Sequence, residues 1–166
     1  MTVRTSLGTI ATRPETEADS AFLYALFETV RGPDFAALPI DPAPLLRMQF
    51  LAMTRGYRAS FPQARFDIVT LNGDPAGQSI VDRTASRFHI VYIALMPEWR
   101  NRGLATALLS PILNEARHLG RPVEATAAIG NIPSLRLWHR LGFEERSRNE
   151  TDIAVAWQPP PPDGGG

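Results

Sequence analysis

The chain lacks both cysteine and lysine across its 166 residues. Without cysteine it has no disulfide framework, no thiolate ligands for zinc and no cysteine nucleophile. Without lysine it cannot form a Schiff base or hold a phosphate in the manner of a P-loop lysine. All seventeen basic residues are arginines, so a bound phosphate must be held by arginine side chains or by backbone N–H groups.

The sequence also lacks a net charge and a long apolar run. Seventeen acidic residues balance the seventeen arginines, which disfavours binding to nucleic acid or to an anionic membrane surface. Residues 1–12 contain no apolar core of a signal peptide, and no later stretch approaches the length needed to span a bilayer. We therefore expect a soluble, cytoplasmic protein with no membrane or nucleic-acid partner and no metal ion.

Length and composition favour one domain followed by a short tail. With 44% hydrophobic residues, a chain of this length can bury a single sizeable core. We expect this domain to extend over residues 1–157. Residues 158–166 read QPPPPDGGG, and because such a segment cannot bury apolar surface, we expect it to be disordered.

Apolar periodicity predicts an alternation of strands and helices. A short strand ends at Arg13–Pro14, and two helices separated by a proline-rich loop follow it. The clearest hairpin has its turn at Asn72–Asp74, and the nearly continuous apolar strand after it indicates a position in the middle of a sheet. The elements predicted after the first strand are helices 22–30 and 45–58, strands 66–71, 76–81 and 88–95, helix 103–118, strand 123–127, helix 135–141 and strand 152–157.

Pro111 lies inside the helix predicted over residues 103–118. Proline removes one N–H to carbonyl bond from a helix and clashes with the preceding turn, at a cost of about 3 kcal/mol. We therefore expect a kink or a break at this position.

Two segments carry the functional signal. The first, Arg100–Ala105, is a tight turn between the apolar strand and the long helix, where a glycine and an alanine leave the backbone approachable. A helix N-terminus presents free N–H groups and the positive end of the helix dipole, which suit a pyrophosphate. The second segment, Asn131–Phe143, reads NIPSLRLWHRLGF and follows the next strand.

Together these segments resemble the GNAT superfamily of acetyl-CoA-dependent N-acetyltransferases. In that family a central strand ends in a Pro-x-x-Arg/Gln-x-x-Gly-x-Gly/Ala turn, and an Asn-x6-Tyr-x-x-Leu-Gly-Phe segment follows the next strand. The chain matches the two patterns at Pro97, Arg100, Gly103 and Ala105 and at Asn131, Leu141, Gly142 and Phe143. The resemblance covers residues 66–157 and implies a mixed α/β fold: a twisted sheet, mostly antiparallel, with one splayed parallel pair and flanking helices.

The resemblance implies acetyl-CoA as cosubstrate, held mainly by backbone groups. The strand residues that would pair with the pantetheine arm are Ile93, Ala94 and Leu95. The N–H groups that would bind the pyrophosphate belong to Arg100, Asn101, Arg102, Gly103, Leu104, Ala105 and Thr106. Asn131 would reach the CoA arm, and Trp138 would pack beside it.

The implied chemistry is direct attack of a neutral primary amine on the thioester in a ternary complex, which needs a base and a proton for the leaving thiolate. His89 lies where some family members have a glutamate base, although it could equally be a strand-edge histidine that faces water. Trp138 occupies the position where the family commonly has a tyrosine proton donor. Because an indole N–H cannot give up its proton near neutral pH, Tyr92, Tyr57 or a bound water could take that role.

The sequence defines the acceptor only as a small-molecule or peptide amine. Residues 32–58 are expected to wall its pocket. If Arg47, Arg55 and Arg58 converge there, they would suit a carboxylate or phosphate on the acceptor; otherwise they form a solvated helix face. The chain fits either a monomer or a homodimer.

Two other hypotheses stay open at this point. The first is an acyl-CoA-binding regulatory or interaction module with impaired catalysis, for which Trp138 is the positive evidence. The second is a nucleotide-binding domain with a coincidental glycine turn. This second hypothesis lacks support from a full G-x-G-x-x-G pattern and from the acidic residue about 20 positions later that binds ribose.

Overall fold

The computed structural model describes residues 1–161, and its centre is one eight-stranded sheet with the order β1-β2-β3-β4-β5-β6-β8-β7. Within these residues, neighbouring strands are antiparallel except for β5 and β6, which run parallel. The strands are β1 (Thr2–Thr5), β2 (Gly8–Pro14), β3 (Arg65–Leu71), β4 (Asp74–Arg83), β5 (Phe88–Leu95), β6 (Val123–Ala128), β7 (Glu144–Arg148) and β8 (Asp152–Trp157).

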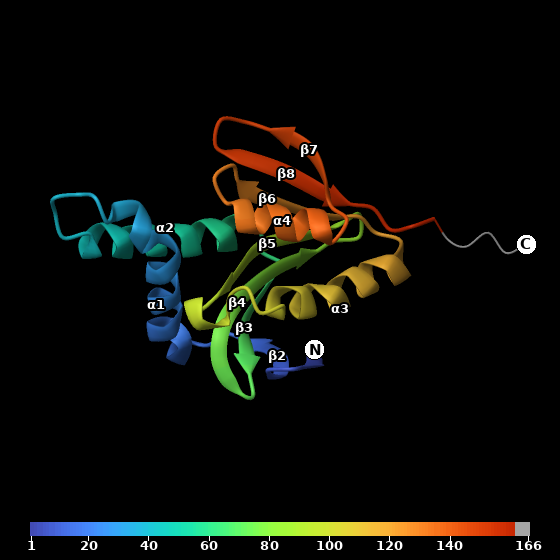
Figure 1. Cartoon of the computed structure of the whole chain (residues 1–166), viewed down its shortest axis with the longest axis horizontal. Helices are drawn as coiled ribbons and strands as arrows, with labels where there is room; N and C mark the ends of the chain where they lie inside the picture. Colours follow the sequence, from blue (N-terminus) through green and yellow to red (C-terminus); the bar gives the residue numbers. More distant parts are fainter. Residues whose placement is uncertain (162–166) are drawn as a thin grey trace, which may run out of the picture.

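Helices flank this sheet. Figure 1 shows α3 and α4 lying across the sheet in the foreground, with α1 and α2 gathered at its left end. None of the helices in residues 1–161 is both long and apolar enough to cross a membrane. The α-helices are α1 (Ser20–Arg31), α2 (Ala43–Ser60), α3 (Leu104–Leu119) and α4 (Ile132–Arg140), and the short 3-10 turns are η1 (Glu17–Asp19), η2 (Gly32–Phe35) and η3 (Pro97–Trp99).

An apolar stripe attaches α3 to the sheet. Its buried residues recur at helical spacing, and they are Leu104, Leu108, Leu109, Ile112, Leu113 and Ala116. The last four share a core cluster with Phe88 of β5, Val123 of β6 and Trp138 of α4. Helices α3 and α4 therefore cover one face of the two parallel strands, and the alternate residues of those strands face the other side.

Helix α2 is attached much more loosely. Leu46 is the one fully buried residue among its 18. The ring of Phe50 lies 5.5 Å from the rings of Tyr24 and Phe27 on α1, and further along the helix the Tyr57 ring lies 6.0 Å from that of Tyr92. Because few of its side chains are buried, α2 lines the sheet without forming part of a thick core.

The predicted fold class is confirmed, as are the central elements. The hairpin with its turn at Asn72–Asp74 forms as predicted, and so does the strand over residues 88–95. Two strands were missed. β1 pairs with β2 to make the start of the chain a hairpin, and β7 reads EERSR with every residue exposed. A charged edge strand carries no apolar alternation, so periodicity could not reveal it.

Of the two outcomes predicted at Pro111, a kink or a break, the break is wrong. Helix α3 runs through this proline without interruption from Leu104 to Leu119. Leu108 and Leu109 before the proline, and Ile112 and Leu113 after it, are all buried. Since both halves of the helix are packed on the sheet, their burial offsets the one lost backbone bond. For the predicted tail, residues 158–161 are irregular, and residues 162–166 lie outside the described part of the chain.

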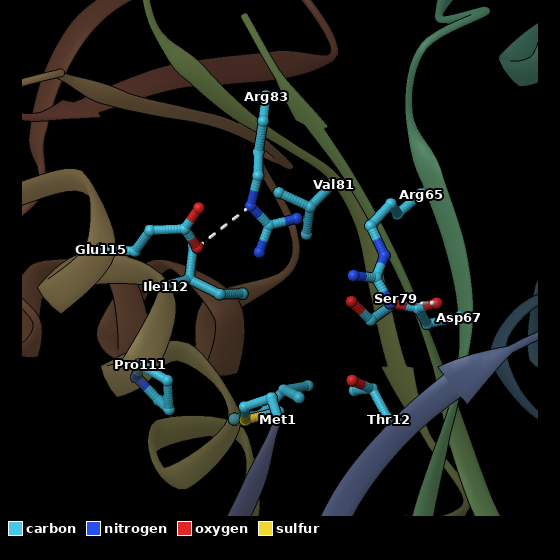
Figure 2. A pocket seen from close by; sticks show the side chains of 11 residues that line it. Met1, Thr12, Arg65, Asp67, Ser79, Val81, Arg83, Pro111, Ile112 and Glu115 are labelled. Atoms are coloured by element: carbon cyan, nitrogen blue, oxygen red, sulfur yellow. Dashed lines mark hydrogen bonds and ion pairs between the residues drawn. The ribbon is translucent and has the colours of Figure 1, made fainter. Parts of the chain in front are cut away.

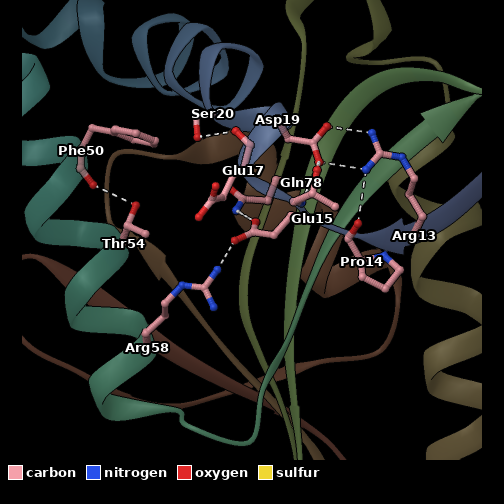
Figure 3. A network of polar contacts seen from close by, with 11 residues as sticks. Arg13, Pro14, Glu15, Glu17, Asp19, Ser20, Phe50, Thr54, Arg58 and Gln78 are labelled. Atoms are coloured by element: carbon pink, nitrogen blue, oxygen red, sulfur yellow. Dashed lines mark hydrogen bonds and ion pairs between the residues drawn. The ribbon is translucent and has the colours of Figure 1, made fainter.

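A polar network fixes the chain where β2 leads into α1 (Figure 3). The buried carboxylate of Asp19 accepts two hydrogen bonds from the Arg13 guanidinium, at 2.9 and 2.7 Å. It also accepts a bond from the Thr16 N–H at 2.8 Å. These donors favour the ionised carboxylate, first Arg13 and then Thr16, and hold the pKa of Asp19 well below its usual range.

We expect Asp19→Asn to lower the free energy of unfolding by about 2 kcal/mol at pH 7, because the amide cannot replace the charge-assisted bonds. The pKa of Asp19 is lower in the folded than in the unfolded state, so its stabilisation is present above about pH 3.9 and is lost as the pH falls further. Urea unfolding should therefore show that the difference in free energy of unfolding between wild type and variant is smaller at pH 3 than at pH 7.

The control is Asp34→Asn, which removes the exposed ion pair between Arg31 and Asp34. Exposed pairs of this kind contribute little, so its effect should stay under about 0.5 kcal/mol. An equal loss of stability for Asp19→Asn at both pH values would contradict the lowered pKa of Asp19.

Candidate active site

The strands β5 and β6 begin as a parallel pair and then separate. Their register pairs are Phe88↔Val123, His89↔Glu124 and Ile90↔Ala125. β5 continues to Leu95 and β6 to Ala128, so the C-terminal part of each strand has no partner across this gap. Unpaired strand edges offer N–H and C=O groups to another extended chain.

The neighbouring strand β4 shows which way the free groups of β5 point. The Met96 N–H donates to the Ala76 carbonyl at 2.8 Å, on the β4 side. Because backbone groups alternate in direction along a strand, the N–H groups of Ile93 and Leu95 point to the opposite side, toward the gap. The carbonyl of Ala94 lies against β4, where a Cβ on Gly77 would come within 2.2 Å of it. Two of the three predicted pantetheine residues therefore offer a backbone donor to the gap.

The turn after β5 presents free amides at the start of α3. Asn101 and Gly103 both have left-handed backbone, with φ of 59° and 79°. The Ala107 N–H donates to the Gly103 carbonyl at 3.1 Å, so the amides of Leu104 to Thr106 precede the first N–H with an acceptor of its own in the helix. A Cβ added at Gly103 meets no atom within 4 Å. The donors thus border open space, which suits an anionic phosphate group.

Arg100 links this turn to its surroundings. Its Nε donates to the Leu95 carbonyl at 2.9 Å, and its Nη2 donates to the Thr29 hydroxyl of α1 at 3.1 Å. Its backbone N–H donates to the Pro97 carbonyl at 3.3 Å. Among the amides predicted to bind pyrophosphate, that of Arg100 is thus already in use, and its side chain joins the end of β5 to α1.

The second predicted segment forms α4 and its contact with the core. Asn131 Oδ1 accepts from the Ser134 N–H at 3.2 Å and caps the helix, while the residue stays exposed. Trp138 is buried, with its ring 4.9 Å from that of Phe143. This packing accounts for Trp138 structurally, and a role for either Asn131 or Trp138 toward CoA stays a prediction.

A bulge in β5 brings His89 and Tyr92 to the same face of the sheet. The register with β4 shifts at Val91, which has no partner of its own. Without the bulge, residues three apart would face opposite sides. His89 instead contacts Phe61, with ring centroids 5.0 Å apart, and Tyr92 lies 6.0 Å from Tyr57. Both predicted catalytic side chains therefore face α2 and the segment that follows it.

Both side chains have protonation states that suit proton transfer. Burial and the nearby Arg87 guanidinium lower the pKa of His89, and the carboxylates of Glu124 and Asp82 partly offset this effect. The imidazole is therefore neutral at pH 7 and has a free lone pair. Burial raises the pKa of Tyr92 to about 12, so its hydroxyl keeps its proton. A neutral imidazole can accept a proton, and a phenol can donate a hydrogen bond.

Two of the three arginines predicted to line an anion site, Arg47 and Arg58, make contacts elsewhere. The Arg58 guanidinium pairs with Glu15 and lies 4.1 Å from the centre of the Phe66 ring, as Figure 3 shows for Glu15. The Arg47 guanidinium lies 4.3 Å from the centre of the Tyr24 ring. These contacts anchor α2 to the residue after β2, to β3 and to α1, and the hypothesis of an acceptor carboxylate held by three converging arginines is not supported.

A small cavity lies on the α3 side of the sheet, apart from these residues (Figure 2). Its volume is about 80 Å³, room for roughly two or three water molecules. The ion pair of Arg83 with Glu115, at 3.2 Å, forms part of its wall, together with Asp67 and Ser79. No predicted site residue lines this cavity. In residues 1–161, no group of three or more acidic or histidine side chains is arranged to hold a metal ion.

Comparison with known proteins identifies the family. The model of the acetyltransferase (GNAT) family matches residues 23–143, so the chain belongs to the GNAT acetyltransferase family. An uncharacterized N-acetyltransferase of Methanocaldococcus jannaschii is 30% identical over 91 residues, which cover 49% of this chain and 39% of that protein. The chain thus spans well under half the length of this relative.

Solved structures share the fold at low sequence identity. The PaiA N-acetyltransferase from Thermoplasma acidophilum, in complex with coenzyme A, has a TM-score of 0.69 at 13% identity over 90% of this chain and 98% of that one. The ribosomal-protein-S18-alanine N-acetyltransferase from Escherichia coli has a TM-score of 0.63 at 18% identity, over 95% and 99%. The predicted GNAT membership and fold are confirmed, and the family's class agrees with the predicted acyltransferase.

We expect Gly103→Glu to weaken acetyl-CoA binding at least about tenfold, or 1.4 kcal/mol, because its carboxylate would occupy the open space beside the free amides. Isothermal titration calorimetry measures this loss. The matched control is Gly120→Glu, at the other end of α3, where the glycine is also left-handed (φ 62°) with open space at Cβ. Equal weakening in both variants, or wild-type binding by Gly103→Glu, would place the pyrophosphate elsewhere.

Proposed function

We propose that this protein is an N-acetyltransferase that moves the acetyl group of acetyl-CoA to a primary amine by direct attack in a ternary complex. The observation that carries the proposal is the gap between β5 and β6 beyond Ile90, with the left-handed turn at Gly103 following β5. The gap offers backbone partners to an amide-containing arm, and the turn offers N–H groups to a pyrophosphate. A protein of the same fold was solved in complex with coenzyme A, which supports this choice of cosubstrate.

The residues present fit acetyl-CoA without any lysine or metal ion. The N–H groups of Ile93 and Leu95 would bind the pantetheine arm, and the amides from Asn101 to Thr106 would bind the pyrophosphate. Asn131 uses Oδ1 to cap α4, which leaves its Nδ2 donors for the arm. Each of these contacts uses a hydrogen-bond donor, as a ligand rich in carbonyl and phosphate oxygens requires.

Bound acetyl-CoA supplies the thioester carbonyl that the amine attacks. His89 takes the proton from the acceptor ammonium, since its imidazole is neutral at pH 7. Tyr92 keeps its hydroxyl proton and donates a hydrogen bond to the departing sulfur. Trp138, buried against Phe143, supports the core beneath the site and transfers no proton.

The acceptor we propose is a small-molecule or peptide amine that enters from the α2 side. His89 and Tyr92 face Phe61 and Tyr57 there, so an amine must approach from this face to meet them. The loose attachment of α2, with one fully buried residue, supports adjustment of this wall to an acceptor.

Trp138 favours a second candidate function, because it replaces the family's usual tyrosine. This candidate is an acyl-CoA-binding regulatory or interaction module that does not turn over. The absence of cysteine allows one assay to distinguish the enzyme from the binding module. A thiol reagent added to protein, acetyl-CoA and a panel of primary amines detects only released CoA. Release above the no-enzyme background supports the enzyme, and binding without release supports the module.

We expect His89→Gln to reduce kcat/KM about 10²-fold, the usual contribution of a general base. In wild type, the acid limb of the pH profile should have an apparent pKa below 6.5, since the pKa of His89 is lowered. The variant should lose this limb, and the thiol-release assay measures both effects.

His139→Gln, on the exposed last turn of α4, controls for loss of an imidazole and should leave rate and profile unchanged. Retention of the wild-type acid limb in His89→Gln would exclude His89 as the base.

A further inference from the structure

Asp82, His89 and Glu124 form a row across three neighbouring strands. Asp82 on β4 is the register partner of His89 on β5, and His89 is the register partner of Glu124 on β6. The preceding residues Phe88 and Val123 belong to the core under α3. The side chains of the row therefore point away from α3, on the face where the amine acceptor is proposed to enter.

The row contains an acid without a partner, and two nitrogens in or beside it, on His89 and Arg87, have no hydrogen-bond partner. Glu124 forms an ion pair with Arg87 Nε at 3.2 Å. Asp82 is only 6% exposed, yet it takes part in none of the ion pairs found in residues 1–161. Arg87 Nη1 and His89 Nδ1 are both buried with no hydrogen-bond partner. Buried polar groups left unpaired are rare and costly, so each of these two nitrogens calls for a partner.

We propose that Asp82 is a positioning residue for His89, joined to His89 Nδ1 by a buried water that also accepts from Arg87 Nη1. The role of the imidazole as a base rests on the proposed function; the bridge itself does not.

The proposed bridge gives both unpaired nitrogens an acceptor and gives Asp82 a donor. The water accepts from the Arg87 Nη1–H and from the His89 Nδ1–H, and it donates to the Asp82 carboxylate. Two accepted bonds leave the water no lone pair for a third donor. The neutral imidazole then carries its proton on Nδ1 and has its lone pair on Nε2. Because His89 is only partly buried, Nε2 is the nitrogen that the amine substrate can reach.

The charged groups around His89 explain why a bridge is needed. They are Asp82 from β4, Arg87 from the turn before β5 and Glu124 from β6, while the segment after α2 contributes the uncharged ring of Phe61. Arg87 and burial both disfavour the imidazolium. When Nε2 takes the proton from the acceptor ammonium, the imidazolium carries protons on both nitrogens. The Asp82 carboxylate, reached through the water, offsets that new charge.

The test is ¹⁵N NMR of the imidazole nitrogens in the full chain. The chain has three histidines, and His89→Gln assigns the signals of His89. We expect the wild-type ring to carry its neutral-state proton on Nδ1. In Asp82→Asn, we expect this preference to be lost and the pKa of His89 to fall further, because the nearest unpaired carboxylate charge is gone.

The control is Asp67→Asn. Asp67 is as buried as Asp82 (7% exposed) but lies beside the cavity on the opposite face of the sheet, so its replacement should not change the His89 signals. A wild-type ring protonated on Nε2 would overturn the proposal even if Asp82→Asn failed to fold. Signals unchanged in a folded Asp82→Asn would also overturn it.

The NMR spectra do not depend on catalytic turnover. The bridge and the proposed function can therefore be rejected independently of each other. Where wild type releases CoA, Asp82→Asn should lower kcat about tenfold and shift the acid limb of the pH profile downward, with KM for acetyl-CoA unchanged. Loss of acetyl-CoA binding instead would indicate a structural role and contradict positioning. No release by wild type, with the ring protonated on Nδ1, would reject the enzyme and keep the bridge.

Discussion

The two parallel strands at the centre of this sheet remain together for only three residue pairs, Phe88↔Val123 to Ile90↔Ala125, and the proposed cofactor site depends on their separation. Each strand is bound more extensively to its other neighbour. β5 has seven register pairs with β4, and β6 has six with β8. The close approach of Gly77 to the Ala94 carbonyl keeps the end of β5 against β4. The sheet thus consists of two halves that join at one end and diverge at the other.

Helix α3 connects these halves and places the phosphate-binding turn at the open end. A parallel pair requires a crossover connection, and here the crossover is α3, whose apolar stripe packs on the core that includes Phe88 and Val123. Since α3 starts just after β5 ends, its free N–H groups lie beside the gap. The backbone donors for a pantetheine arm and those for a pyrophosphate therefore follow from one βαβ connection, in which Asn101 and Gly103 supply the left-handed backbone of the turn.

Features set by local chemistry could be predicted from the sequence. The hairpin turn at Asn72–Asp74 and the tight turn at Arg100–Ala105 between β5 and α3 depend on residues close in the chain. Features set by pairing between distant segments could not be predicted. The bulge at Val91 decides that His89 and Tyr92 share a face, because a shift of one residue turns every later side chain over.

Dependence on distant segments also explains the predictions that were missed or wrong. The row that joins Asp82, His89 and Glu124 exists only through strand register, so no spacing in the sequence reveals it. The exposed strand β7 has no apolar signal. Pro111 remains helical because the flanking leucines are buried against a sheet formed by distant segments. Arg58 pairs with Glu15, 43 residues earlier, instead of lining an acceptor site.

The most direct test of the gap as the cofactor site is a titration of coenzyme A into the ¹⁵N-labelled protein, followed by backbone amide spectra. The amides of Ile93 and Leu95 and those from Gly103 to Thr106 should shift together with a single saturation curve, while the amides of Gly120 and of β7 stay unchanged. Saturable shifts confined to another surface, or no shifts in a folded protein, would contradict the account.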